Sequence, residues 1–363
     1  MKRLRTDVAV IGTGGAGMMA ALEAFDKGAE VLVVSKGLIG KGTCTSLAGG
    51  FFNASSQQLS LEEHYQQTME AGRGINDPQI VELVVNHANE CLDRLRDMGV
   101  PLLGFPRGFV VNNQGNQKEI PGLPLVQAMG NLLAERNIKS LTGFHSLELL
   151  IEEGRTAGVL GLDTDGEPVI ISAPSVILAT GGAGAIYLRN DNPGGIIGDG
   201  YAMALRAGCQ LQDLEFIQFF PIGLAQPGLS PFLIYPPYPP EARVFDAEGR
   251  DVLQELENCS DLMEAVIHFR DTASLFFYRK HLQGGLFLDL TAVKETAWNE
   301  LNSMRLLARN KIDFRRQRVG IAPTTHFFLG GLVVNNRSET SLPGLFAAGE
   351  VTGGFHGANR LGG

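Results

Sequence analysis

The sequence has no long apolar run, no basic excess and few cysteines. No apolar run approaches the roughly 20 residues that a membrane-spanning helix needs, and the first residues offer no secretory signal segment. With 30 Lys and Arg against 39 Asp and Glu, the net charge is −9, which argues against a nucleic-acid partner. The four cysteines form no C-x-x-C pair, so neither a disulfide framework nor a metal or iron–sulfur site is expected. We therefore expect a cytoplasmic protein without direct membrane insertion, with peripheral attachment to a membrane through a partner as the alternative.

Glycine, by contrast, is abundant. The 363 residues include 46 glycines, nearly twice the ordinary share of about 7%. They follow no G-x-y period and gather at the ends of strand-like apolar runs, where a backbone without a Cβ can approach a ligand closely. With 44% hydrophobic and 19% charged residues, the composition is that of a globular protein. The length of 363 residues is enough for two domains.

The first glycine cluster lies within a predicted strand–turn–helix–strand unit. Apolar patterning predicts strands at 7–11 and 30–34 and a helix at 18–27. The intervening turn, Gly12-Thr13-Gly14-Gly15-Ala16-Gly17, fits G-x-G-x-x-G in the context in which glycines admit a pyrophosphate to a helix N-terminus. The second strand ends in Ser35-Lys36 rather than in the acidic residue usual for NAD, so this unit leaves the nucleotide open.

Two further glycine clusters follow later strands. Helices are predicted at 61–73 and 78–98, and short strands at 147–152, 156–163, 168–172 and 175–179. A meander of this kind that returns to a second cluster, here 179–184, is typical of flavoproteins with two nucleotide-binding motifs. The third cluster, 344–350, ends in Gly349-Glu350, whose carboxylate could accept hydrogen bonds from ribityl or ribose hydroxyls.

A segment of different composition, 226–323, lies between the second and third glycine clusters. It holds the proline run 236–240, helical patterns at 271–282 and 297–310, and most of the aromatic residues, which predicts an inserted second domain. Only one G-x-G-x-x-G is present, so a second dinucleotide domain for NAD(P)H is not expected in this chain.

Eight ordered motifs carry a resemblance to a known family. They are Gly12 to Gly17, Ser35-Lys36, Ala48-Gly49-Gly50, Ala179 to Gly184, Gly198-Asp199-Gly200, Leu214 to Gln218, Thr325-His326 and His356 to Gly362. Over essentially its whole length the chain resembles the flavoprotein subunits of succinate dehydrogenase and fumarate reductase, with L-aspartate oxidase as a close cousin. In the family the chain continues beyond the position of Gly363, first as a helix that faces the flavin, so the resemblance implies a truncated or partial sequence.

The resemblance implies a fold and a reaction. The fold is α/β: a Rossmann-like FAD-binding domain of the glutathione-reductase type, residues 1–225 and 324–363, interrupted by an α+β capping domain, residues 226–323. The implied reaction is hydride transfer between flavin N5 and a small anionic substrate, and the implied protein partner is an iron–sulfur or other electron-transfer subunit. The alternative is an FAD-binding electron-relay or assembly subunit without substrate chemistry of its own.

The resemblance also implies the cofactor site. Its residues are Gly12, Gly14, Gly15, Ala16, Gly17, Ser35, Lys36, Gly42, Thr43, Cys44, Ala48, Gly49, Gly50, Ala179, Thr180, Gly181, Asp199 and Glu350. The histidine that bonds covalently to FAD in membrane-bound members falls on Thr43. Noncovalent FAD is therefore expected, as in aspartate oxidase.

The implied substrate site departs from the family pattern. The family's H-P-T-G-L appears as Phe220 to Leu224, so its histidine and threonine are replaced by Phe220 and Ile222. The glutamate and the proton-donating arginine of T-E-G-x-R fall on Tyr235 and Tyr238; with a small deletion, Glu241 and Arg243 could take these roles instead. We therefore expect a monoanionic substrate with an apolar tail rather than ordinary fumarate.

A cationic trio remains as the implied catalytic set: Arg270, His326 and Arg360. Three such side chains beside one cofactor would need an anion among them, so we expect them to converge on an anionic substrate. Each also has a structural alternative. Arg270 with Asp271 could form a surface ion pair, His326 could be a hydrogen-bonded core residue, and Arg360 a structural clamp.

Overall fold

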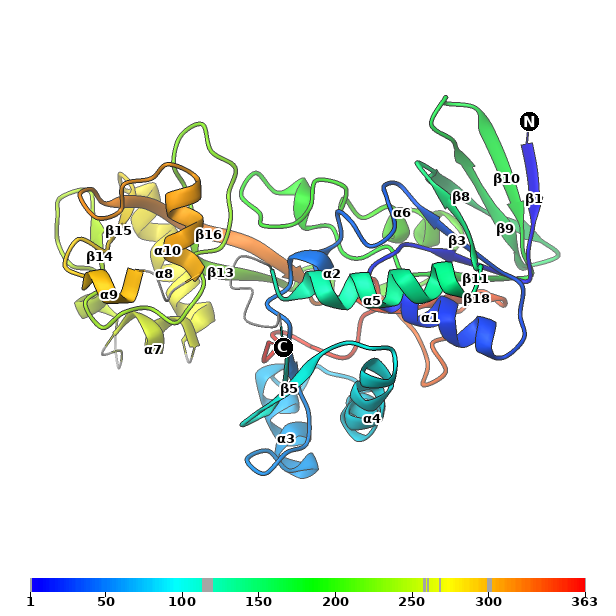
Figure 1. Ribbon diagram of the computed structural model, residues 1–363, viewed down its shortest axis with the longest axis horizontal. Coiled ribbons are helices and arrows are strands. Elements are labelled where there is room, and N and C mark those ends of the chain that lie inside the picture. Colours follow the sequence, from blue (N-terminus) through cyan, green and yellow to red (C-terminus); the bar gives the residue numbers. More distant parts are fainter. Residues whose placement is uncertain are drawn as a thin grey trace. The chain divides into compact units, whose positions relative to one another are not determined.

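The chain forms two compact units in a computed structural model that describes residues 2–112, 120–256, 259, 261–267, 269–298 and 302–362 (Figure 1). Unit 1 comprises Met1–Ile186, Pro193–Ile217 and Phe328–Gly363. Unit 2 comprises Tyr187–Asn192 and Gln218–Phe327.

A parallel sheet forms the centre of unit 1. Its strands lie in the order β18-β11-β2-β3-β7, and all four pairings are parallel. The inner strands are almost uniformly apolar and buried, as expected where both faces of a parallel sheet are covered. Their bounds are β2 Val8–Ile11, β3 Val31–Ser35, β7 Lys139–Thr142, β11 Ser175–Leu178 and β18 Leu345–Ala347.

Two helices pack together beside this sheet and share one hydrophobic core with it. Helix α1 (Gly15–Asp26) joins β2 to β3, and α5 (Gly122–Glu135) lies alongside α1 (Figure 1). Met18 and Leu22 of α1 and Met129 of α5 are almost fully buried in this core. The predicted strand–turn–helix–strand unit is thus observed, although α1 begins three residues earlier than the expected start at Met18 because Gly15 to Gly17 already form its first turn.

The predicted meander is also observed in unit 1. Its strands pair antiparallel in the order β10-β9-β8, with β1 added parallel to β10. Among the residues that the structure describes, unit 1 also has a three-stranded sheet, a two-stranded pair and four further α-helices. The bounds are β1 Lys2–Arg5, β8 His145–Glu152, β9 Arg155–Leu162, β10 Pro168–Ser172, β4 Phe51–Asn53, β5 Leu102–Phe105, β6 Gly108–Val111, β12 Leu211–Gln212, β17 Gly331–Leu332, α2 Cys44–Leu47, α3 Leu61–Ala71, α4 Pro78–Asp97 and α6 Asp199–Arg206.

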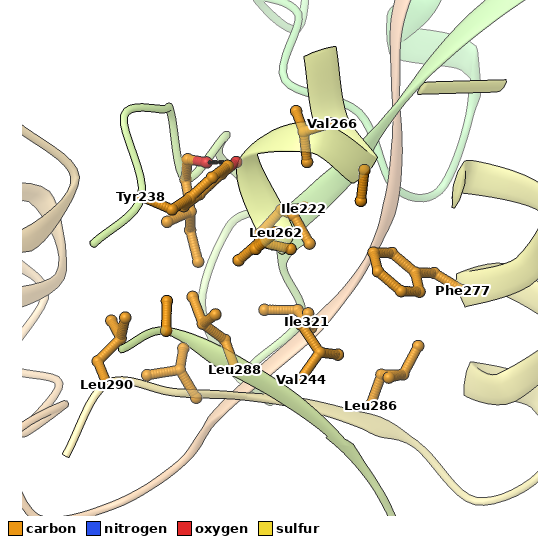
Figure 2. Close-up of a cluster of buried hydrophobic side chains, with 14 of the residues drawn as sticks. Ile222, Tyr238, Val244, Leu262, Val266, Phe277, Leu286, Leu288, Leu290 and Ile321 are labelled. Atoms are coloured by element: carbon orange, nitrogen blue, oxygen red, sulfur yellow. Dashed lines mark hydrogen bonds between the residues drawn. The ribbon is translucent and has the colours of Figure 1, made fainter. Parts of the chain in front are cut away.

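Unit 2 is built on a four-stranded sheet in the order β13-β16-β15-β14. Strand β15 pairs antiparallel with both β14 and β16, and helices complete the core that Figure 2 shows. The unit includes Gln218 to Leu224 because β13 belongs to its sheet, and it includes 187–192 because Asn190 forms a bridge with Thr325 of β16. Its elements are β13 Ile217–Leu224, β14 Arg243–Asp246, β15 Leu286–Asp289, β16 Val319–Phe328, α7 Leu262–Ile267, α8 Arg270–Leu282, α9 Glu295–Trp298 and α10 Asn302–Arg309.

The helix expected at 297–310 is only partly covered by the structure. Helices α9 and α10 occupy its two ends, and 299–301 lie outside the described residues. Within the described ranges, no helix has the length and apolar character needed to cross a membrane.

Candidate cofactor and substrate sites

The three glycine clusters meet at one edge of the parallel sheet in unit 1. They follow the carboxyl ends of β2, β11 and β18, which are neighbours in the sheet. Backbone hydrogen bonds link these ends: the Ala179 N–H donates to the Ile11 carbonyl at 2.8 Å, and the Ala348 N–H donates to the Leu178 carbonyl at 2.9 Å. Ligands of open α/β sheets bind outside the carboxyl ends of the strands, so this edge is the candidate cofactor site.

Glycine is required in the first turn for close packing. Gly12 has φ +114°, and a Cβ there would lie 2.1 Å from the carbonyl oxygen of Ala179. A Cβ at Gly17 would lie 2.1 Å from the carbonyl oxygen of Gly12. These two glycines therefore let the turn pass tightly between α1 and the end of β11.

The N-terminus of α1 suits an anion. Its first turn consists of Gly15, Ala16 and Gly17 and carries no acidic side chain, while the N-cap residue Gly14 has no side chain of its own. The Gly15 N–H donates to Thr45 Oγ1 at 3.0 Å. N–H groups of a first helical turn lack partners within the helix, and the helix dipole adds positive potential, so the turn fits a pyrophosphate.

The short helix α2 brings several expected residues beside this turn. Thr43 is its N-cap: the Thr43 hydroxyl accepts from the Ser46 N–H at 3.2 Å and donates to the Gly40 carbonyl at 3.0 Å. Gly42 and Cys44 flank Thr43, and the following loop includes Ala48, Gly49 and Gly50. The contact of Thr45 with α1 was not predicted. The sequence feature that could have indicated it is the presence of hydroxyl residues between Thr43 and Ser46, close to glycines.

Ser35 and Lys36 lie where β3 ends. The Ser35 and Thr13 hydroxyls hydrogen-bond at 3.1 Å, which connects this strand end to the glycine turn. Lys36 forms an ion pair with Asp199, the first residue of α6, and donates to the Gly195 carbonyl at 3.0 Å. Both charged residues were expected at the site, but their pairing across 163 positions of sequence was not visible in the local pattern.

Glu350 and Thr180 supply polar atoms at the second and third clusters. Glu350 Oε1 accepts from the Phe328 N–H at 3.0 Å, and a Cβ at Gly182 would lie 2.4 Å from the same oxygen. Thr180 Oγ1 is buried and has no hydrogen-bond partner among the described residues. Buried hydroxyls normally have partners, so Thr180 also fits a bound group that is not part of the chain.

In unit 2, His326 is held by a carboxylate. His326 Nδ1 lies 2.8 Å from Asp191 Oδ2, and the two side chains are 24% and 11% exposed. Asn192 supports both, because its Nδ2 donates to Asp191 Oδ1 at 3.1 Å and to the His326 carbonyl at 3.2 Å. Asp191 was not predicted as a site residue, because Asn-Asp-Asn-Pro is also a common loop composition.

The other two members of the cationic trio lie in different units. Arg270, the first residue of α8 in unit 2, is half-buried; burial lowers the pKa of its guanidinium, while the charge of Asp271 raises it. Arg360 belongs to unit 1, where burial and then the charge of Arg360 lower the pKa of His356 to about 3. Convergence of Arg270, His326 and Arg360 on one anion therefore stays a prediction.

Three of the four residues that replace the family's substrate-site residues belong to the core of unit 2: Phe220, Ile222 and Tyr238. Ile222 is fully buried and Tyr238 is 6% exposed, and Figure 2 shows both among the packed apolar side chains. The Tyr238 hydroxyl donates to the Ile234 carbonyl at 2.5 Å, and burial together with Tyr235 raises its pKa. The expectation that Ile222 and Tyr238 face a substrate is wrong because their side chains are used to fill the core.

Phe220, which stands where the family has a histidine, lies beside His326. Its ring centroid lies 6.2 Å from that of His326 in an edge-to-face arrangement, and 6.5 Å from that of Tyr235. Arg243, considered as a substitute for the family arginine, donates to the carbonyls of Pro240 and Ala242 at 2.6 and 2.9 Å. Its guanidinium is thus engaged by its own loop.

Comparison with known proteins gives one family-model match and many relatives. The model described as an FAD binding domain matches residues 7–363. A fumarate reductase (CoM/CoB) chain of Methanothermobacter marburgensis is 33% identical over 384 residues, covering 98% of this chain and 69% of the relative. L-Aspartate oxidase of Bacillus subtilis is 31% identical over 366 residues, covering 98% of this chain and 68% of the relative.

A solved structure agrees with these relatives. The FrdA chain of a quinol fumarate reductase variant from E. coli has a TM-score of 0.84 and is 27% identical. The match covers 100% of this chain and 67% of the other. The chain thus spans about two thirds of the length of the proteins to which it is similar.

Proposed function

Because the chain belongs to the succinate dehydrogenase and fumarate reductase family of FAD-dependent oxidoreductases, we propose that it binds FAD noncovalently at the carboxyl edge of the parallel sheet in unit 1. The mixed α/β fold, with parallel and antiparallel sheets, resembles that of a fumarate reductase flavoprotein. In finer detail we propose that unit 1 is a Rossmann-like FAD-binding domain and that unit 2 is an α+β capping domain.

One observation supports the location of the cofactor most strongly. Three glycine clusters, separated by more than 300 positions of sequence, follow neighbouring strands at the same sheet edge. A structural role alone would account for Gly12 and Gly17, which pack against backbone oxygens. A structural role does not explain why the Thr180 hydroxyl has no hydrogen-bond partner among the described residues. It also does not explain why the first turn of α1 consists of glycine and alanine without a charged side chain.

Each side chain at this edge has a definite task in the proposal. FAD, when bound, supplies a hydride acceptor or donor. The first-turn N–H groups of α1 hold its pyrophosphate. The Glu350 carboxylate, which already accepts from the Phe328 N–H, accepts a further hydrogen bond from a ribose or ribityl hydroxyl. Thr180 Oγ1 gains the hydrogen-bond partner that it lacks within the described residues.

The contacts of Thr43 support noncovalent binding. Its hydroxyl caps α2 and donates to the Gly40 carbonyl, so it is engaged in the local fold. An unactivated threonine hydroxyl is also a weak nucleophile, which makes it a poor replacement for a histidine that bonds to flavin.

The proposed substrate is a small anion, bound by Arg270, His326 and Arg360. Relatives named fumarate reductase and L-aspartate oxidase make a carboxylate the first class to test. The first of these relatives is named as one component of a larger enzyme, which supports an electron-transfer protein, with iron–sulfur centres or another carrier, as a further partner. A purely electron-relaying role is not favoured, because relatives with enzyme names match nearly the whole chain.

Acid precipitation of the purified yellow protein tests the mode of binding. Trichloroacetic acid should release all flavin into the supernatant, and flavin retained by the washed pellet would contradict the proposal. Anaerobic mixing with succinate, L-aspartate or other small carboxylates should then bleach the flavin absorbance with at least one of them. Bleaching only in the presence of a protein donor would instead support the relay role.

A further inference from the structure

Asp191 contacts His326 in a way that determines how the imidazole can exchange a proton. The 2.8 Å distance joins Asp191 Oδ2 to Nδ1 of the ring. An ionised carboxylate only accepts hydrogen bonds, so Nδ1 must carry the hydrogen. A proton that the ring gains from or gives to a bound molecule therefore passes through Nε2.

The surrounding contacts hold this arrangement in place. Asn192 Nδ2 donates both to Asp191 Oδ1 and to the His326 carbonyl, so its amide nitrogen faces the carboxylate. The Asp191 N–H donates to the Thr325 carbonyl at 3.2 Å, and the Thr325 N–H donates to the Arg189 carbonyl at 2.9 Å. These two backbone hydrogen bonds join the loop 187–192 to β16 next to Asp191 and His326.

We propose that Asp191 is a positioning residue that makes His326, in unit 2, the proton-transfer group of the proposed substrate site. The inference rests on the proposed oxidoreductase function. Dehydrogenation of a substrate removes one hydrogen as a hydride, which FAD chemistry accepts, and a second as a proton. His326 Nε2 takes that proton as the substrate double bond forms, and the Asp191 carboxylate stabilises the resulting imidazolium. In the reverse direction the imidazolium returns the proton.

The effect of Asp191→Asn on the tautomer of His326 can be predicted because Asp191 accepts hydrogen bonds from two donors. One carboxylate oxygen faces Asn192 Nδ2 and the other faces His326 Nδ1. An asparagine side chain has only one oxygen. If that oxygen faces Asn192, its NH₂ group faces Nδ1 and the neutral imidazole must carry its hydrogen on Nε2. Asp191→Asn should therefore invert the tautomer of His326 with almost no change in volume.

Nitrogen NMR of FAD-loaded protein labelled with ¹⁵N-histidine tests this directly. The His326 signals are assigned by their loss in His326→Gln. The neutral ring should carry hydrogen on Nδ1 in the native protein and on Nε2 in Asp191→Asn. Glu248→Gln, which removes an exposed carboxylate of unit 2 that pairs with Arg250, should leave the tautomer unchanged. Hydrogen on Nε2 in the native protein would overturn the assignment.

Kinetics with a carboxylate that bleaches the flavin distinguish proton transfer from binding. Asp191→Asn should lower kcat by about 100-fold or more, the usual contribution of a general acid or base, with KM changed much less. A raised KM with unchanged kcat would show that His326 only binds the substrate. A native protein that binds no flavin would contradict the proposed function. Unchanged kinetics in an Asp191→Asn variant with full flavin content would contradict only the role of Asp191.

Discussion

The Gly12→Ala substitution tests the geometry of the glycine turn most severely. At φ +114° an alanine is strained by about 1–3 kcal/mol. Its Cβ would also lie 2.1 Å from the Ala179 carbonyl oxygen, whereas Cβ contacts below 3.0 Å are essentially never observed. The end of β11 or the turn must therefore shift by about 0.9 Å, which is overpacking that costs about 1–3 kcal/mol more.

Gly28→Ala is the matched control. Gly28 has φ +88°, but a Cβ there would have no atom within 4 Å and the residue lies outside the proposed cofactor site. The control should lose only the strain energy, partly offset by an unfolded chain with less conformational freedom. The difference between the two variants isolates the overlap with Ala179.

Urea unfolding of flavin-free protein, followed by far-ultraviolet circular dichroism, measures this difference. Gly12→Ala should be less stable than Gly28→Ala by about 1–3 kcal/mol and should purify with little FAD, because the displaced turn supports the pyrophosphate. Equal stabilities together with full flavin content in Gly12→Ala would refute the argument that this turn is tightly enclosed and binds the cofactor.

Three further predictions concern Glu350, His356 and the arginines. Glu350→Ala should weaken FAD binding by about 1.5–3 kcal/mol, measured by fluorescence titration, whereas Glu350→Gln should keep the bond from the Phe328 N–H; an unchanged dissociation constant in both variants would limit Glu350 to the fold. Because the folded-state pKa of His356 is lowered to about 3 from 6.5, its contribution to stability is complete above pH 6.5 and should fall as the pH drops towards 3. The urea midpoint of His356→Gln should change less over that window than the native midpoint, and parallel pH curves would contradict this. Arg270→Gln and Arg360→Gln should each weaken carboxylate binding in a flavin-absorbance titration, and native affinity in either variant would remove that arginine from the proposed site.

The strand–turn–helix–strand unit could be predicted because its information is local. Apolar residues at 8–11 and 31–34 are buried on both sides of a sheet, and the glycines between them leave few alternatives to a tight turn. Family motifs then linked the later clusters, and their position at one sheet edge follows from parallel pairing.

The substrate side could be predicted less well. Aligning Tyr238 with a family residue does not tell which way the Tyr238 side chain points. In the structure its ring packs into the core and its hydroxyl donates to the Ile234 carbonyl. Asp191 and His326 are 135 positions apart, so only the fold reveals that a carboxylate holds the histidine. Lys36 and Asp199 were each expected at the site, but their ion pair likewise depends on tertiary structure.

A crystal structure of the FAD-loaded protein would test the central claim most directly. We expect pyrophosphate oxygens within hydrogen-bond distance of the first-turn N–H groups of α1, a cofactor hydroxyl on Glu350, and no covalent bond between the flavin and Thr43. Electron density for the pyrophosphate away from the Gly12 to Gly17 turn, or a flavin bonded to the chain, would contradict it.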